Sequence, residues 1–475
     1  MKTSFDAVVV GAGPNGLAAA VRIAEAGHAV LVVEAADTIG GGCRTAALTL
    51  PGFTHDVCAA VHALGVDAEP LSAAHLGVHA PQWSRPDVPL AHPLDGGRAA
   101  LQYRSIDDTA NGLGIDGDAW RRLLQPLVDR WDDVRAELMR PVLHVPSHPL
   151  LLARFGVHAL QPATWTAGRF RTEGAAALFG GSAAHAMLPL SRPFTTAFGL
   201  LLGASAHASG WPVATGGSQH VVDGLAARLV ELGGEIRTGV RVESIEQLPP
   251  HRVALFDTNP GQLADIAGEA LPARHRARLR RFRHGPGAFK VDYALDGPMP
   301  WTNPDCHRAG TLHVVGSFAE LVRAEADVAA SRMPERPFVL AVQASVCDPT
   351  RAPDGRHTLW AYAHVPHGHT GDATAAIERQ LERFAPGFRD RVLARHVRTP
   401  AELHDDNANY VGGDIAGGAH TGAQLLFRPT IGWRSYVTPN PAILLCSAST
   451  PPGAGVHGMC GWNAAGAALA GPLRN

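Results

Sequence analysis

The sequence predicts an α/β fold in which a nucleotide-binding domain built on a parallel sheet carries an inserted α+β domain. Three observations indicate this fold: a glycine-rich turn between a buried strand and a helix at the start of the chain, another glycine-rich stretch near its end, and two long intervening blocks without such signals. We expect a discontinuous nucleotide-binding domain at residues 1–62, 211–285 and 405–475. Residues 63–210 and 286–404 are assigned to the substrate or cap domain.

The chain opens with a strand, a turn and a helix. Residues 6–10 (DAVVV) form a short apolar run rich in β-branched residues, which predicts a buried strand. Residues 11–16 (GAGPNG) fit the pattern G-x-G-x-x-G. Residues 17–26 have helical composition and end at Gly27, and residues 29–34 (AVLVVE) predict a second buried strand.

Each glycine of this turn has a separate role in a nucleotide site. Gly11 permits the tight turn, Gly13 lets a pyrophosphate approach the backbone, and Gly16 lets helix and strand pack closely. The N-terminus of the helix offers free N–H groups and a partial positive charge to the phosphates. The turn residues assigned to the nucleotide site are Gly11, Gly13, Pro14, Asn15 and Gly16.

An acidic residue ends the second strand. Glu34 lies 18 residues after Gly16, close to the roughly 20 residues expected in a dinucleotide-binding unit. Its carboxylate can accept both hydroxyl protons of an adenosine ribose. A glycine-rich turn without a ligand would leave this residue unexplained.

A second glycine-rich loop follows the second strand. Gly40, Gly41 and Gly42 are consecutive, and Arg44 comes two residues later. NAD alone does not require such a loop, which suits a second backbone approach to a pyrophosphate with Arg44 as its charge partner. The combination with Glu34 favours FAD as the cofactor.

Composition excludes several classes of function. The chain has 475 residues and a net charge of −2, so nothing drives it as a whole toward nucleic acid or acidic membranes, and we expect no nucleic-acid partner. None of the six cysteines forms a C-x-x-C pair, which argues against a thiol–disulfide reductase and against zinc, and favours a reducing compartment. We therefore expect no metal site.

The first apolar run leads directly into the glycine-rich turn, so no signal peptide is expected. No apolar run reaches the ~18 to 20 residues of a membrane span, and Pro193–Ala206 predicts a buried helix beside a substrate cavity. We expect a cytoplasmic protein and leave membrane association open. The basic run His275–His284 predicts a solvated helix face, with a phospholipid-facing patch as the alternative.

Several further elements can be predicted along the chain. Residues 118–138 form a helix with one apolar stripe, which Pro126 should kink or divide. The other predicted helices are 219–232, 324–332, 375–384 and 463–469. One predicted strand, 53–60, carries Asp56 and Cys58. The remaining predicted strands are 235–237, 241–245, 253–256, 287–295, 336–347 and 442–447.

The glycine-rich pieces together resemble a known family. The chain is similar to phytoene-dehydrogenase-like FAD oxidoreductases, within the group of pyridine nucleotide-disulfide oxidoreductase domain-containing protein 2, whose broader relatives are carotenoid desaturases and flavin amine oxidases. The resemblance implies a Rossmann-like FAD-binding domain of the glutathione-reductase type, amine-oxidase-like, with an inserted α+β substrate domain. The motifs that carry it are GAGPNGLAAA, IGGGCRT, GFTHD, residues 212–242, NYVGGDIAGG and TPPGAGVHGMCGWNAA.

The resemblance also implies roles for single residues. The first-turn glycines hold the FAD pyrophosphate, Glu34 the adenosine ribose, and Gly40 and Gly41 match the family's double glycine. Amine oxidases place arginine directly after that pair, where this chain has Gly42, so Arg44 departs from the pattern. Residues 56–60 match the strand that passes the isoalloxazine. The remaining matches are Val242, whose backbone meets the adenine, and Met459, Cys460 and Gly461 in the C-terminal loop near the flavin ring.

A desaturation needs a C–H bond aimed at flavin N5 and a group that accepts the other proton. His62 is the candidate base, because it follows the flavin-facing strand and histidine titrates near neutral pH. Asp56 is a poorer candidate, since a carboxylate beside flavin more often positions a backbone or a histidine. Lys290 can position water at N5, as a lysine does in amine oxidases, or form an ion pair in the cap. Other residues that can line the cavity are His207, Trp211, Trp360, Tyr362 and His364.

Three functions follow. The first is an FAD-dependent dehydrogenase or desaturase that uses non-covalent FAD, removes hydride from a small, largely apolar organic substrate, and touches a membrane at most peripherally. The second is a flavin amine oxidase that produces hydrogen peroxide. The third is a flavin-dependent isomerase without net redox turnover or a flavin-bound scaffold. The substrate, the electron acceptor and the oligomeric state cannot be read from the sequence.

Overall fold

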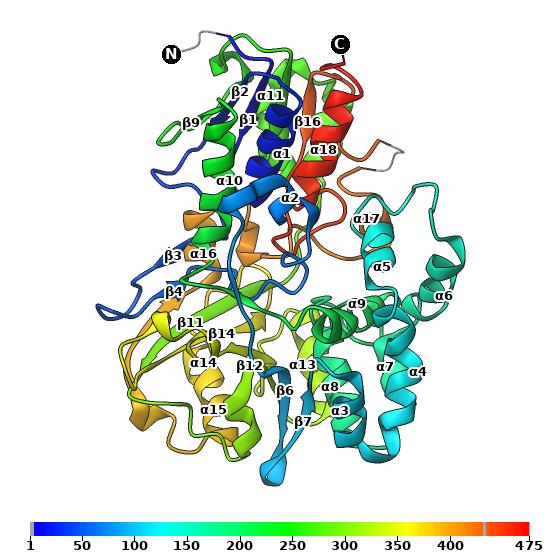
Figure 1. Cartoon of the computed structure of the whole chain (residues 1–475), viewed down its shortest axis with the longest axis vertical. Helices are drawn as coiled ribbons and strands as arrows, with labels where there is room; N and C mark the ends of the chain where they lie inside the picture. Colours follow the sequence, from blue (N-terminus) through cyan, green and yellow to red (C-terminus); the bar gives the residue numbers. More distant parts are fainter. Residues whose placement is uncertain (1–3, 431–433, 475) are drawn as a thin grey trace.

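The computed structural model describes residues 4–430 and 434–474 and divides into two halves (Figure 1). A five-stranded sheet with its helices forms the upper half, and a seven-stranded sheet with a group of helices forms the lower half. The predicted α/β fold with a nucleotide-binding half and an α+β half is confirmed.

The five-stranded sheet is parallel throughout, with the order β16-β10-β1-β2-β9. Four of its strands are short, apolar and buried, as expected for a parallel sheet covered on both faces, whereas the edge strand β9 is polar at both ends and half-buried. The predictions for these strands are confirmed to within two residues at each end. The strands are β1 (Ala7–Val10), β2 (Val30–Val33), β9 (Glu235–Arg237), β10 (Val253–Phe256) and β16 (Ile443–Leu445).

Helices cover both faces of this sheet. Successive side chains of β1 point to opposite sides, so both faces are apolar and need a cover. Ala7 and Val9 pack in the core below α1, α10 and α18, whereas Val8 and Val10 pack with α11. Proline at the first position of α1 explains why this helix begins before the predicted Leu17. The helices are α1 (Pro14–Glu25), α10 (Gln219–Glu231), α11 (Pro260–Ala267), α12 (Ala273–Arg280) and α18 (Met459–Leu469).

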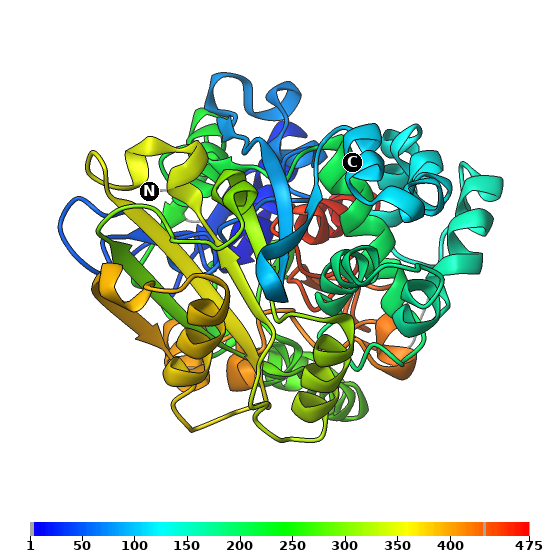
Figure 2. The ribbon, with the colours of Figure 1, turned by 90° about the horizontal axis from the view of Figure 1, so that it is seen from below.

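The seven-stranded sheet has the order β15-β11-β14-β13-β12-β6-β7 and is antiparallel except at the pair β6–β12 (Figure 2). All of its strands come from the two blocks predicted as inserts, although the exact domain boundaries stay a prediction. The strands are β6 (Val88–Leu94), β7 (Arg98–Gln102), β11 (Gly287–Leu295), β12 (Ala309–Val314), β13 (Val339–Val342), β14 (His357–Val365) and β15 (Val392–Arg398).

Helices pack beside this sheet. Trp120, Leu124, Phe179 and Leu200 form an apolar core with the side chains of β13 and β14. No helix among the described residues is long and apolar enough to cross a membrane. The helices of this half are α3 (Ile106–Gly112), α4 (Gly117–Val128), α5 (Trp131–Leu138), α6 (Pro149–Ala159), α7 (Ala163–Ala167), α8 (Glu173–Ala184), α9 (Thr195–Ala208), α13 (Phe318–Ala329), α14 (Ala344–Cys347) and α15 (Thr374–Phe384).

Short elements connect the two halves. Among them, the hairpin β3–β4 extends from the nucleotide-binding half and contacts β14 of the other half. These elements are α2 (Ala73–Leu76), α16 (Pro400–Asp406), α17 (Gly422–Leu426), β3 (Thr45–Ala46), β4 (His55–Asp56), β5 (Trp83–Ser84) and β8 (Val213–Ala214).

Three local predictions need correction. Residues 241–245 form no strand, because β9 is the edge of its sheet and the chain turns instead over a cavity. The run 336–347 is a strand only as far as Val342, after which Gln343 begins the turn into α14. The strand predicted at 53–60 is limited to β4, and Cys58 lies in a bend after it. The helix predicted at 118–138 is divided as expected, two residues beyond Pro126.

Candidate functional site

The main cavity of the nucleotide-binding half has a volume of about 520 Å³ and lies beyond the carboxyl ends of β1, β2 and β10. In open α/β sheets this edge is where ligands bind. The lining comes from distant parts of the chain: Val10–Gly11, Gly13–Asn15, Val33–Thr38, Gly41–Gly42, Arg44, Val240–Val242, Asp257–Thr258, Gln262, Ile266, Asp405–Tyr410, Ile415, Gly417, Ser447–Ser449 and Gly453–Val456.

The β1–α1 turn has the geometry of a phosphate cradle. Gly11 has φ +104°, a conformation that favours glycine, and a Cβ on Gly16 would lie 2.1 Å from the Gly11 carbonyl oxygen. Among the described residues, no group pairs with the buried Oδ1 of Asn15, which lines the cavity. The bare backbone and this unpaired amide fit a cofactor with a pyrophosphate.

Glu34 lines the cavity at the end of β2. Its carboxylate accepts hydrogen bonds from the backbone N–H of Ala12 (2.7 Å to Oε2) and of Ala36 (2.9 Å to Oε1). These bonds fix the orientation of the carboxylate, which has acceptor capacity left for hydroxyl groups of a ligand.

The second glycine-rich loop lies against the first. A Cβ on Gly41 would lie 3.3 Å from the Gly13 Cα, and a Cβ on Gly42 only 2.0 Å from the Tyr410 hydroxyl. The third glycine therefore makes room for a tyrosine. Arg44 lines the cavity, but its guanidinium already donates to the Gly41 carbonyl (3.0 Å) and to the Asp406 carboxylate (2.5 Å).

The C-terminal glycine-rich loop lines the same cavity and leads into α18. A Cβ on Gly461 would lie 1.7 Å from the Asn15 carbonyl, so this glycine lets α18 pack tightly against the first turn of α1. Met459 packs with Met139 and Trp462. The Cys460 thiol contacts the carbonyls of Thr450 and Gly453, and burial raises its pKa to about 12.

Of the predicted cofactor residues, eight line the cavity and five do not. The five outside the lining are Gly16, Gly40, Met459, Cys460 and Gly461. The lining residues are Gly11, Gly13, Pro14, Asn15, Glu34, Gly41, Arg44 and Val242.

Sequence reasoning missed Asp257 as a site residue. It directly follows β10 and lines the cavity, where its Oδ2 accepts a hydrogen bond from the Gly16 backbone N–H at 2.9 Å. Burial, with a smaller contribution from the charge of Glu34, raises the pKa of Asp257 to about 7. The signal was available, since an acid ending a buried parallel strand lies at the ligand-binding edge.

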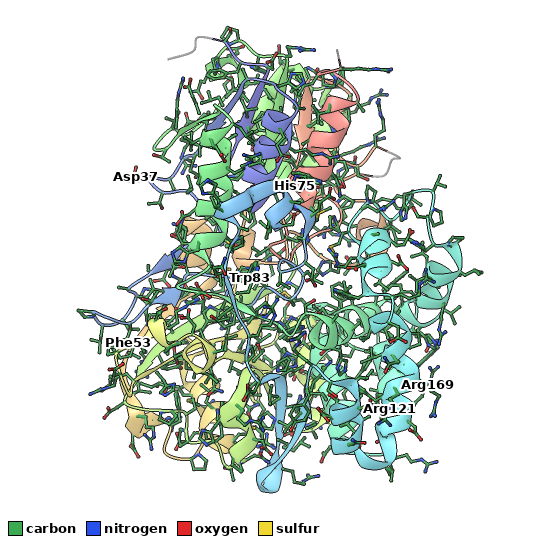
Figure 3. All side chains as sticks on the ribbon, viewed as in Figure 1. Asp37, Phe53, His75, Trp83, Arg121 and Arg169 are labelled. Carbon is green, nitrogen blue, oxygen red and sulfur yellow. The ribbon has the colours of Figure 1, made fainter. Side chains whose placement is uncertain are left out.

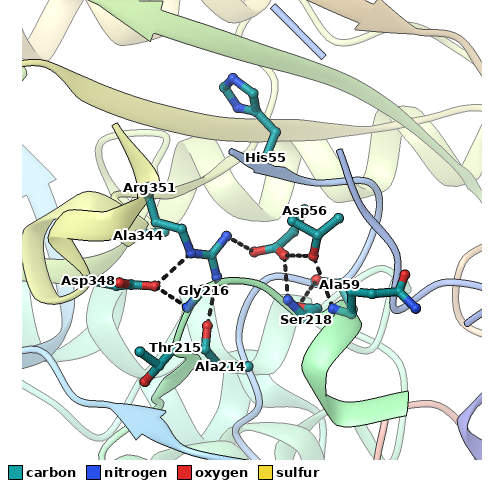
Figure 4. Close-up of polar contacts among 12 residues, drawn as sticks. His55, Asp56, Ala59, Ala214, Thr215, Gly216, Ser218, Ala344, Asp348 and Arg351 are labelled. Atoms are coloured by element: carbon teal, nitrogen blue, oxygen red, sulfur yellow. Dashed lines mark hydrogen bonds and ion pairs between the residues drawn. The ribbon is translucent and has the colours of Figure 1, made fainter. Parts of the chain in front are cut away.

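Asp56 lies in a buried polar cluster rather than in the cavity lining (Figure 4). Its carboxylate accepts from Arg351 Nη1 (2.9 Å), from the backbone N–H of Ser218 (2.7 Å) and from the Thr45 hydroxyl (3.0 Å). Arg351, fully buried, also donates to Asp348 and to the Ala214 carbonyl. These contacts join the two halves, and they give Asp56 the surroundings of a positioning group. A catalytic role for Asp56 stays a prediction.

His62 is buried beside the same cluster. Its Nε2 lies 3.0 Å from the Ser218 hydroxyl, which donates to the Ala59 carbonyl at 2.6 Å. We therefore assign the ring proton to Nε2, and within the described chain no group pairs with Nδ1. Burial lowers the pKa of His62 to about 4, so its imidazole is neutral at pH 7.

The predicted cap residues are all buried; ring contacts link Lys290, Trp360, Tyr362 and His364, whereas His207 and Trp211 make contacts of their own. Lys290 forms an ion pair with Asp292, and its ammonium lies 5.5 Å from the centre of the Trp360 ring. His207 accepts from the Trp120 indole, and the Trp211 indole donates to Ser205. His364 Nδ1 lies 2.8 Å from the Glu325 carboxylate, and the Trp360 and Tyr362 rings meet at 83° with centres 5.2 Å apart.

The chain is similar to known proteins along most of its length. The sequence pattern of the family described as flavin-containing amine oxidoreductases matches residues 15–386. The mouse protein named pyridine nucleotide-disulfide oxidoreductase domain-containing protein 2 is 26% identical, over 98% of this chain and 93% of its own length. The lycopene-forming phytoene desaturase of Pseudescherichia vulneris is 24% identical, over 95% of this chain and 96% of its own.

Among solved structures, cyclohexylamine oxidase from Brevibacterium oxydans aligns with a TM-score of 0.60. The alignment covers 99% of this chain and 100% of the oxidase at 16% identity, so the likeness concerns the fold.

Proposed function

Since the chain belongs to the family of flavin-containing amine oxidoreductases, it is an FAD-dependent oxidoreductase, and we propose that it acts as a dehydrogenase or desaturase on a small, largely apolar organic substrate. The observation that carries the proposal is that two glycine-rich loops from opposite ends of the chain line one cavity. The apolar substrate is supported by the phytoene desaturase among the relatives and by the apolar cap core.

The cofactor is proposed to lie along this cavity. Bound FAD supplies the hydride acceptor of the reaction. The β1–α1 turn holds the pyrophosphate, Glu34 orients the adenosine ribose, and the backbone at Val242 meets the adenine. We propose a non-covalent attachment, because the buried Cys460 thiol is neutral and directed at two carbonyls.

The protein must also accept one proton from the substrate for each hydride removed. His62 is the proposed base: it is neutral at pH 7, and its Nδ1 lone pair has no partner within the described residues. Asp56 and Arg351 hold the Ser218 backbone and thereby the hydroxyl that orients His62. Asp56 is therefore proposed to position the base.

An amine oxidase is the second candidate. Its support is the match to the family of flavin-containing amine oxidoreductases and the nearly perpendicular ring pair of Trp360 and Tyr362 beside Lys290. Such an enzyme would release hydrogen peroxide when supplied with amines and oxygen.

Cytoplasmic location with peripheral membrane contact is also proposed. The basic helix α12 gives little support as the contact site, since Arg276 donates to the Gly268 and Leu271 carbonyls and Arg280 pairs with Asp265. We therefore interpret α12 as a solvated helix face.

The test is an absorption spectrum of the purified protein before and after acid precipitation. We expect flavin bands that pass into the supernatant, followed by bleaching with polyene-like substrates under anaerobic conditions. Bands that stay in the pellet would contradict non-covalent attachment. Bleaching by amines alone, with peroxide release in air, would favour the amine oxidase, and no bands after incubation with FAD would refute the cofactor assignment.

A further inference from the structure

The helix α6 and its neighbouring loops expose an unusual amount of apolar surface. We call residues 140–165 the α6 tip; it runs from the end of α5 to α7. Of the twelve large hydrophobic side chains that are exposed in the described residues, seven belong to this stretch. They are Val142, Leu143, Val145, Leu150, Val157, Leu160 and Trp165.

The sequence of α6 would suit a buried helix. Its eleven residues include only two polar ones, Arg154 and His158. A helix that is apolar on all sides normally lies in a core. Here Leu150, Ala153 and Val157, spaced along one helix face, are exposed instead, while Leu151 on another face is buried.

The tip projects from the body and is held at its base. Both views show α6 standing away from the two sheets (Figures 1 and 2). The buried Glu137 accepts hydrogen bonds from His144 Nε2 (2.6 Å) and from the His148 backbone N–H (2.7 Å). The exposed apolar side chains are thus presented on a defined loop.

The tip and the residues that directly flank it within 138–172 carry charge of a single sign. Residues 138–172 contain four arginines, three histidines and no aspartate or glutamate, although the whole chain has a net charge of −2. Arg154 lies exposed on α6, and Arg169 points outward beyond α7 (Figure 3). Within the described residues, acids reach the tip only at its base on α5, where Glu137 and Asp133 pair with His144 and His148. The apolar surface beyond that base carries only basic groups, which makes it complementary to an anionic lipid surface.

We propose that the α6 tip docks this protein onto anionic membranes, with α6 lying in the interface. Val145 and Leu150 enter the acyl boundary, and the arginines contact lipid phosphates. Trp165 occupies the interfacial level that tryptophan prefers. A projecting convex tip suits a bilayer, which accommodates any insertion shape, better than a protein partner, which would need a matching hollow. The proposal rests on the peripheral membrane contact proposed above, to which it gives a site, and does not depend on the substrate.

The experiment is co-sedimentation of the FAD-loaded full chain with vesicles. Vesicles of phosphatidylglycerol and phosphatidylcholine should retain the protein, whereas pure phosphatidylcholine should retain less, and raising the salt should release it. Val145→Asp and Leu150→Asp should each lower partitioning by about tenfold, because each removes an apolar contact.

A matched control, Val78, lies in the other half of the molecule. Val78 is 94% exposed, compared with 89% for Val145, so Val78→Asp changes a similarly exposed valine outside the tip and should leave partitioning unchanged. Arg154→Gln should reduce binding to the anionic vesicles only. The flavin spectrum of each variant, recorded first, shows that it folds and binds its cofactor.

Three results would overturn the proposal: no binding to anionic vesicles, equal losses in Val78→Asp and Val145→Asp, or a dimer in light scattering that Val145→Asp converts to a monomer. The last result would assign the tip to a second copy of the chain. A protein that sediments with vesicles but lacks flavin would refute the proposed function and leave the docking surface intact.

Discussion

The Gly16 backbone N–H donates a hydrogen bond to the Asp257 carboxylate at 2.9 Å, across 241 residues of sequence. The acid thus occupies the N-terminus of α1, where the phosphates of a dinucleotide are held. An ionised Asp257 would repel them, whereas a protonated one would not.

Asp257→Asn should therefore tighten FAD binding at alkaline pH. Because the pKa of Asp257 is raised to about 7, the wild-type carboxyl is neutral below that pH and charged above it. FAD affinity should fall by about tenfold between pH 6 and pH 8.5 in the wild type and stay nearly constant in the variant. Fluorescence titration at both pH values measures this; a wild-type affinity independent of pH would contradict it.

Glu34→Gln should weaken FAD binding by at least about tenfold. Glutamine has one acceptor oxygen and therefore cannot accept from both the Ala12 and Ala36 N–H groups and the ribose. Asp37→Asn is the control, since Asp37 is an exposed acid of the same cavity wall. Equal effects of the two substitutions would show that charge alone matters.

Gly42→Ala should lower flavin occupancy, because its Cβ would lie 2.0 Å from the Tyr410 hydroxyl. Tyr410→Phe removes that oxygen, so the double variant should regain most of the lost occupancy. The ratio of flavin to protein absorbance after purification is the readout. A double variant as poor as Gly42→Ala alone would place the clash elsewhere.

Arg351→Met should destabilise the protein by about 3–5 kcal/mol, because it leaves the buried carboxylates of Asp56 and Asp348 unpaired. Arg356→Ala removes a more exposed ion pair with Asp296 and should cost about 1 kcal/mol or less. Urea denaturation of both variants beside the wild type tests the contrast. A change in Arg351→Met as small as in the control would mean that solvent reaches the cluster.

His62→Asn should slow anaerobic flavin bleaching by a productive substrate about 100-fold or more, as expected for loss of a general base. His364→Asn changes another buried histidine, one that pairs with Glu325, and should slow it far less. Since the pKa of His62 is lowered to about 4, the wild-type rate should be flat above pH 6 and fall only in strong acid. A larger loss in His364→Asn would transfer the role to the cap.

Local sequence patterns predicted the parts of the fold that are contiguous. The strand, glycine turn and helix at residues 7–25 follow each other directly, and the apolar runs of β10 and β16 need only their own composition to be recognised. The predicted strand at 241–245 failed because β9 already forms the sheet edge, a fact of tertiary pairing that no local pattern records.

The same distinction applies to the site. The lining glycines and Glu34 belong to one short motif and could be named in advance. Asp257 and Tyr410 reach the cavity only because β10 pairs with β1 and because the segment after α16 folds back over Gly42. Asp257 could still have been named from its place directly after a buried strand, whereas no local pattern brings Tyr410 to the cavity.

The order of the parallel sheet has a consequence for synthesis. The strand that completes it on one side, β16, contributes residues 443–445, while β1 contributes residues 7–10. At the roughly 5–20 residues per second of translation, the N-terminal motif leaves the ribosome tens of seconds before the last strand of its sheet, which pairs with β10. The cavity walls at Ser447–Ser449 arrive equally late. A nascent chain therefore cannot enclose its cofactor, and loading is one of the final events of its biogenesis.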